Sequence, residues 1–113
     1  MEIEEKSVGD VAILTLNGRL DAYSSNDVER RINALIDDDC VRIVVNLDGV
    51  EYISSSGLRV MLASLKRLKK EEGDLKLACL KPYVKEVFDI AGFTQLFEIY
   101  DREEEAVNSS WDE

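Results

Sequence analysis

The stretch from Val41 to Leu47 (VRIVVNL) constrains the fold more than any other part of the chain. β-branched residues dominate it, and a short run of this kind is typical of a strand that is covered on both faces. It is far shorter than the roughly 18 apolar residues that a membrane helix needs, and no other apolar run approaches that length. We therefore expect the central strand of a sheet, in a protein without membrane insertion.

The segments around this strand alternate between strand and helix patterns. Residues 2–7 and 11–17 flank the turn pair Gly9-Asp10 and predict an N-terminal hairpin. The other expected elements are a helix over 25–37, an amphipathic helix from about Leu58 to near Gly73, a strand over 75–80, a helix opening at Pro82, a strand over 97–100 and a short helix after residue 101. This order predicts an α/β fold, a mixed sheet with an N-terminal hairpin, later parallel strands and about four helices.

One domain accounts for the whole chain, residues 1–113. A chain of 113 residues leaves no room for a second core, and 45% apolar residues supply an ordinary first one. The formal net charge is −10, and residues 101–113 carry half of it. We interpret that acidic C-terminal stretch as a short helix with a solvated tail, in which Trp111 makes at most a weak contact.

Composition excludes several classes of function. The sequence has no histidine, which removes serine-histidine and cysteine-histidine catalysis. Cys40 and Cys79 form no paired motif, so we expect two buried free thiols in a reducing cytoplasm and no metal or cofactor. The acidic balance opposes direct binding to nucleic acid or anionic lipid and favours a partner with a basic surface.

The segment from Asp48 to Leu58 follows the central strand, and in such sheets functional loops lie at the carboxyl ends of strands. It brings Ser54, Ser55 and Ser56 to the start of the amphipathic helix. The free N–H groups there can be capped by a hydroxyl or can hold a phosphate. From composition alone, plain capping is the more economical interpretation. Gly57 would let another surface approach the backbone closely.

A second cluster of cap-type residues precedes the first helix. Ser24 and Asp27 have the spacing of a capping box.

Catalysis by any of the serines at 54–56 is not expected, because no lysine stands at pairing spacing and Ile53 occupies the first glycine position of a nucleophile elbow. We therefore expect a binding protein and not an enzyme.

Residues 41–62, VRIVVNLDGVEYISSSGLRVML, closely resemble the signature of the STAS domain family, named for sulfate transporters and anti-sigma-factor antagonists. Gly18-Arg19-Leu20-Asp21 is similar to the family's Gly-x-Leu-Asp element, and residues 84–93 resemble its late helix and the following turn. The resemblance covers essentially the whole chain. It implies a STAS-like domain acting as a standalone anti-sigma-factor antagonist of bacterial type.

The resemblance further implies partner switching that regulates sigma-factor-dependent transcription. The unphosphorylated protein would bind an anti-sigma factor with serine kinase activity, phosphorylation would release it, and a serine phosphatase would reset it. The family's acceptor is the first of the two hydroxyl residues before the glycine, which maps onto Ser55. Ser54 stands where the family often has Asp, which leaves Ser54 and Ser56 as alternative acceptors.

Seven residues are then expected to bind the partner: Asp21, Asp48, Ser54, Ser56, Gly57, Leu58 and Arg59. In that interface a phosphate on Ser55 would have to be desolvated beside Asp21 and Asp48. Arg19 and Arg59 add positive charge where some members have acidic or small residues, so the identity of the partner does not transfer. The alternative is a STAS subunit that binds without switching, in a sensory complex or in a lipid or anion transport system.

Overall fold

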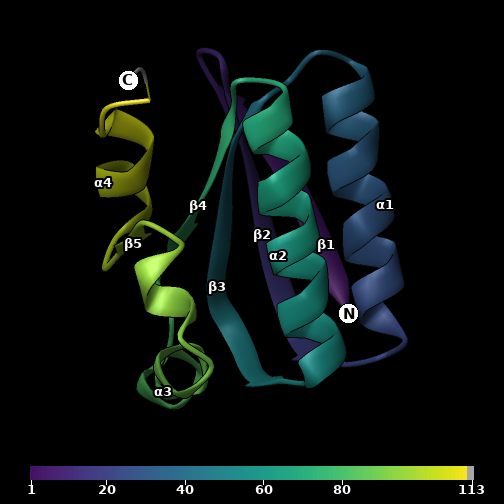
Figure 1. Ribbon diagram of the computed structural model, residues 1–113, viewed down its shortest axis with the longest axis vertical. Helices are drawn as coiled ribbons and strands as arrows, with labels where there is room; N and C mark the ends of the chain where they lie inside the picture. The colour runs from purple at the N-terminus through teal and green to yellow at the C-terminus, as the bar shows by residue number, and fades with distance from the viewer. Residues whose placement is uncertain (112–113) are drawn as a thin grey trace.

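Five strands form one mixed sheet in the order β1-β2-β3-β4-β5 (Figure 1). The structure is a computed structural model, and it describes residues 1–111. β1 pairs antiparallel with β2, and the remaining neighbours pair in parallel, which confirms the hairpin and the later parallel strands. The strands are β1 (Glu2–Val8), β2 (Val11–Leu20), β3 (Arg42–Ile53), β4 (Asp74–Ala78) and β5 (Ile99–Tyr100).

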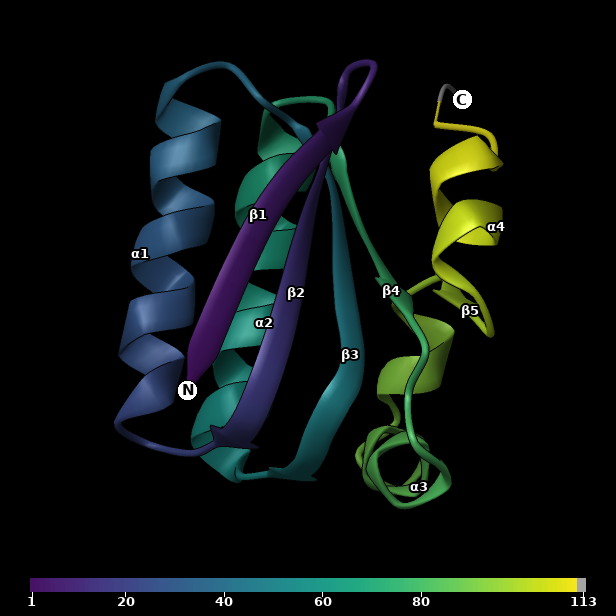
Figure 2. The same ribbon diagram turned by 180° about the vertical axis from the view of Figure 1, so that it is seen from behind.

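The helices differ in how they cover the sheet. They are α1 (Ser24–Asp37), α2 (Ser55–Lys70), α3 (Pro82–Ile90) and α4 (Glu103–Asn108), with a 3₁₀ turn, η1 (Phe93–Gln95). α1 and α2 lie side by side on one face of β1, β2 and β3, and α4 stands beside β4 and β5. Figure 2 shows the opposite face of the sheet, where neither α1 nor α2 lies and where Ala106 of α4 packs with Val11, Ile13 and Val44. None of the described helices is long and apolar enough to cross a membrane.

β3 is covered on both faces over its first half, as the apolar run predicted. Ile43 and Val45 point into the main core under the helices, where Phe88 of α3 packs edge-on against Phe97 at a ring distance of 5.9 Å. Val44 points the other way, into a smaller cluster. The members of this second cluster are Val11, Ile13, Val44, Ala78 and Ala106.

The predicted loop from Asp48 is largely strand. β3 continues to Ile53 because β2 also continues, and Leu20 lies opposite Ile53 in the register. The pairing passes through irregularities between Thr15 and Asn17 and between Gly18 and Arg19. Only Ser54 therefore connects β3 to α2. The other element bounds differ from those expected by up to three residues.

The C-terminal stretch packs on one side against the rest of the domain. Ala106 of α4 is fully buried, and the Trp111 indole N–H donates to the carbonyl of Val107 at 3.0 Å. At the start of α4, the Glu103 carboxylate pairs with Lys6 at 2.9 Å and accepts from the Asn46 amide at 2.9 Å. The expected short helix forms, and Glu104 and Glu105 are exposed as expected, but the stretch packs on one side through residue 111 instead of being solvated throughout. Residues 112 and 113 lie outside the described part of the chain.

The two cysteines are half-buried, and not buried as expected. Cys40 lies just after α1, where its N–H donates to the carbonyl of Leu35 at 2.9 Å. Cys79 follows the last residue of β4 in a left-handed conformation, with φ of 63°. Both thiols sit at ends of elements, where the chain leaves the core, and this position explains their partial exposure.

Candidate functional site

The ends of β2 and β3 meet at the first turn of α2. The N–H of Ser54 donates to the carbonyl of Leu20 at 2.9 Å, which ties the two strand ends together. Ser54 is also the N-cap of α2, and its hydroxyl accepts from the N–H of Gly57 at 3.2 Å. The connection thus places the helix start directly at the edge of the sheet, with no flexible loop between them.

The structure distinguishes the three serines. Ser54 is half-buried and its hydroxyl serves as the cap, while Ser56 is also half-buried. Ser55 is exposed at the first position of α2, and among residues 1–111 no group hydrogen-bonds its hydroxyl. Ser55 therefore offers the most accessible hydroxyl at the positive end of the helix dipole.

Asp21 organises the neighbouring turn before α1. Its carboxylate accepts from the N–H groups of Tyr23 at 3.0 Å and Ser24 at 3.1 Å. The hydrogen bond from the Ser24 backbone contributes most to lowering the pKa of Asp21 below its ordinary value, and the bond from Tyr23 adds to the effect. The expected capping box of Ser24 and Asp27 does not form, because the Ser24 hydroxyl donates to the carbonyl of Arg19 at 2.6 Å and Asp27 pairs with Arg30.

Replacing this carboxylate by an amide should change how stability depends on pH. A depressed folded-state pKa stabilises the protein above the unfolded-state pKa, and this contribution disappears as the pH falls through the folded-state value. Asp21→Asn should therefore lower the urea midpoint at pH 6. The difference in midpoint between this variant and the wild type should shrink as the pH drops below about 4. Asp10→Asn, in the exposed β1–β2 turn, controls for the loss of one charge. A gap that stays constant down to pH 3 would contradict this role of Asp21.

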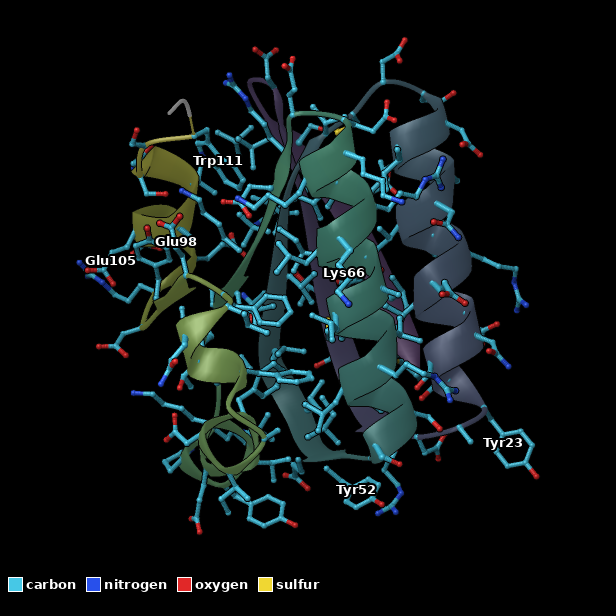
Figure 3. All side chains as sticks on the ribbon, in the orientation of Figure 1. Tyr23, Tyr52, Lys66, Glu98, Glu105 and Trp111 are labelled. Carbon is cyan, nitrogen blue, oxygen red and sulfur yellow. The ribbon has the colours of Figure 1, made fainter. Side chains whose placement is uncertain are left out.

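Figure 3 shows Tyr52 next to the start of α2, and Tyr23 at the start of α1, where it points outward. The Arg19 guanidinium lies 4.2 Å from the centre of the Tyr52 ring, across the extended β2–β3 pair. Tyr23 is 87% exposed, and beside it a shallow cavity of about 320 Å³ is lined by Arg19, Asp21 and Ser24 among others. The sequence did not reveal the Arg19–Tyr52 pair, because it depends on the unexpected continuation of β3. An aromatic residue directly before cap-type serines was the available signal for Tyr23.

Asp48 does not belong to this cluster. It lies on β3, about 16 Å of strand before Ile53, and its N–H donates to the Asn46 side chain at 2.9 Å. Its carboxylate is near Cys79, where burial first and the charge of Asp48 second raise the pKa of the thiol. The structure therefore brings Asp21 to the start of α2 and leaves Asp48 away from it.

Gly57 is buried and is needed by the fold itself. A Cβ at this position would lie 2.8 Å from the side chain of Ile53 and 3.0 Å from the carbonyl of Leu20. The close approach that the sequence suggested is thus to the chain's own strands. Leu58 is half-buried, and Arg59 is exposed one helical turn beyond Ser55.

Comparison with known proteins identifies the family to which this chain belongs. The chain matches the STAS domain over residues 2–106 and belongs to the STAS domain family. A Bordetella bronchiseptica protein named as a candidate anti-sigma factor antagonist, BtrV, is 35% identical over 94% of this chain and 91% of its own. The anti-sigma F factor antagonist of Paenibacillus polymyxa is 30% identical over 95% of this chain and 92% of its own.

Solved structures agree on the fold. The anti-sigma factor antagonist SpoIIAA in its unphosphorylated form aligns with a TM-score of 0.84 at 23% identity, covering 95% of this chain and 94% of its own. Phosphorylated SpoIIAA of Bacillus aligns with a TM-score of 0.76 at 21% identity, covering 95% and 97%. The mixed five-stranded sheet with four helices is therefore the STAS fold, as the resemblance implied.

Proposed function

We propose that this protein is an anti-sigma-factor antagonist whose binding surface surrounds the start of α2, and that phosphorylation of Ser55 switches it off. The observation that carries the proposal is the exposed Ser55 hydroxyl at the first position of α2. The names of the relatives support an anti-sigma factor as the type of partner. We propose that this partner also has serine kinase activity. The proposed location is the cytoplasm, where transcription is regulated.

The unmodified surface suits protein binding. Ser55 is small and neutral, so covering it costs little desolvation. Arg59, one helical turn from Ser55, and Tyr23, exposed at the start of α1, are side chains of the types that dominate binding energies in protein interfaces. The net charge of −10 favours a partner with a basic surface and a fast encounter at low salt.

A phosphate changes the surface without changing the fold. It adds roughly −1.5 to −2 charges at pH 7. At a helix N-terminus this charge stabilises the isolated domain by about 0.3 to 1 kcal/mol. In an interface the same group must be desolvated next to Asp21, and an uncompensated buried charge costs several kcal/mol. Release of the partner follows from this difference between the free and the bound state.

The partner supplies the chemistry of the switch. The kinase transfers the γ-phosphoryl group of ATP to the Ser55 oxygen, so that ADP leaves and the hydroxyl proton passes to a base of the kinase. A serine phosphatase hydrolyses the ester and restores the hydroxyl. This chain provides the acceptor and the docking surface, and none of its residues is assigned a catalytic role.

Mass spectrometry after incubation with ATP and each candidate serine kinase of the source genome tests the acceptor directly. We expect a single phosphate, localised by fragmentation to Ser55, and none on Ser55→Ala. A phosphate on Ser54 or Ser56 would keep the switch and move the acceptor. No phosphate from any candidate would instead favour a STAS subunit that binds without switching, in a sensory complex or a lipid or anion transport system.

A further inference from the structure

One lysine is fully buried, and its position was not apparent from the sequence. Lys76 lies in the middle of β4, and its side chain is 0% exposed. It points to the face of the sheet that α4 covers, opposite the main core. A buried ammonium needs several partners to offset its lost hydration.

These partners come mainly from the C-terminal end of the described chain. The Lys76 ammonium donates to the Ser109 hydroxyl at 2.7 Å and to the Ser110 carbonyl at 2.6 Å. It also lies 4.3 Å from the centre of the Trp111 ring, at cation–π distance. The Glu98 carboxylate is more remote at 3.5 Å, and its side chain is half exposed.

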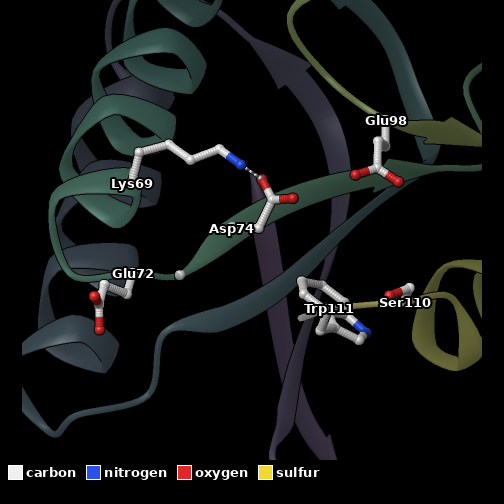
Figure 4. Close-up of a pocket in the computed structure, with 7 residues that line it drawn as sticks. Lys69, Glu72, Asp74, Glu98, Ser110 and Trp111 are labelled. Carbon is white, nitrogen blue, oxygen red and sulfur yellow. Dashed lines mark ion pairs between the residues drawn. The ribbon is translucent and has the colours of Figure 1, made fainter. Parts of the chain in front are cut away.

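Residues 109–111 are called here the clasp segment, and they also make contacts within the C-terminal stretch. Within this stretch, the Ser109 hydroxyl donates to the carbonyl of Ala106, and the Trp111 indole N–H donates to the carbonyl of Val107. On the outer side, Ser110 and Trp111 border an open cavity of about 440 Å³ that separates them from Lys69 and Asp74 (Figure 4). The clasp segment also lies beyond residue 106, where the match to the family ends.

We propose that Lys76 fastens the clasp segment to the sheet, so that the C-terminal end can open and close while the rest of the domain stays folded. α4 spans six residues, far fewer than an isolated helix needs to be stable in water. Glu103 fastens its start through a partly exposed ion pair, and Lys76 fastens its end through buried contacts. Opening lifts Val107 and Trp111 off the second cluster and uncovers part of Val11, Ile13, Val44 and Ala78.

The experiment compares Lys76→Met with Lys66→Met in the chain of 113 residues. Methionine keeps the volume of the lysine stem but cannot donate to Ser109 and Ser110. Lys66 is exposed on α2, so its replacement controls for the loss of one charge. Trp111 is the only tryptophan, which makes its fluorescence a specific probe of the clasp segment.

For Lys76→Met we expect acrylamide quenching of Trp111 to rise at least twofold. Amide exchange over 103–111 should accelerate at least tenfold, and exchange in α1 and α2 should stay within twofold of wild type. Lys66→Met should match wild type in both measurements. Unchanged quenching and exchange in Lys76→Met would overturn the proposal, and so would equal acceleration in all elements, because the segment would then not open separately.

A measurement on the wild type keeps the proposal testable should Lys76→Met fail to fold. In low concentrations of urea, amides of α4 should exchange with a weaker dependence on urea than amides of β3, since local opening exposes less surface than global unfolding. The same dependence in both elements would show that α4 opens only with the whole domain, and the proposal would fail. None of these results depends on Ser55 or on a partner.

Discussion

Ser55→Glu is expected to lower the affinity for the anti-sigma partner by about two orders of magnitude, which corresponds to about 2.7 kcal/mol. The carboxylate imitates part of the phosphate charge at the first position of α2, where it is accepted by the free helix end. In the complex it must be desolvated close to Asp21, so the cost appears only on binding. Calorimetric titration with the kinase identified by mass spectrometry measures the effect.

Three further proteins make this experiment specific. Ser55→Ala should bind as wild type does and resist phosphorylation, because it removes only the hydroxyl. Gln95→Glu adds the same charge at an exposed position of η1 and should bind within twofold of wild type. Phosphorylation of the wild type should lower the affinity for the partner by two to three orders of magnitude, because a phosphate carries more charge than a Glu carboxylate. Equal affinities of wild type and Ser55→Glu would disprove the switch.

Gly57→Val should lower the free energy of unfolding by about 3 kcal/mol, at the upper end of overpacking costs. The new Cβ would meet Ile53 at 2.8 Å and the side chain of Leu20 at 2.9 Å, and the Cγ methyl groups would add to the conflict. The carbonyl of Leu20 also accepts a hydrogen bond from the N–H of Ser54. If the strand moved away to relieve the clash, this hydrogen bond between the strand end and the start of α2 would break.

The matched control is Ala63→Val, an exposed position on the same helix. Its cost should stay below about 1 kcal/mol, since only helix propensity changes there. Urea denaturation followed by circular dichroism compares the two variants at equal m-value. A Gly57→Val protein as stable as Ala63→Val would mean that the first turn of α2 can withdraw from the sheet without loss.

Local patterns in the sequence sufficed for most of the fold. The β-branched run at Val41–Leu47 and the helical spacing of apolar residues each encode which face is buried, and the structure confirms both. The continuation of β3 to Ile53 escaped prediction, because polar residues there are held by pairing with β2 and not by their own pattern.

The candidate site likewise combines features that local sequence patterns encode with features that arise only from contacts in the fold. Ser55 was predicted from a run of cap-type serines at a helix start together with the family resemblance, and Asp21 was predicted from the Gly-x-Leu-Asp element of that resemblance. Asp48 was misplaced, since it was assigned to a loop although it lies within a strand, on the face opposite α2. The burial of Lys76 was hidden for a related reason, because its partners lie more than thirty residues away in the C-terminal stretch.

The one-residue connection at Ser54 has a thermodynamic consequence for binding. A recognition loop normally loses conformational entropy when it settles against a partner, and this loss reduces affinity. Here the proposed acceptor, Ser55, directly follows Ser54, which is held between a strand end and a helix cap, so docking has little backbone entropy left to remove. Under the proposed function, even a modest contact area can then give tight association, and the charge of one phosphate on Ser55 is expected to reverse it.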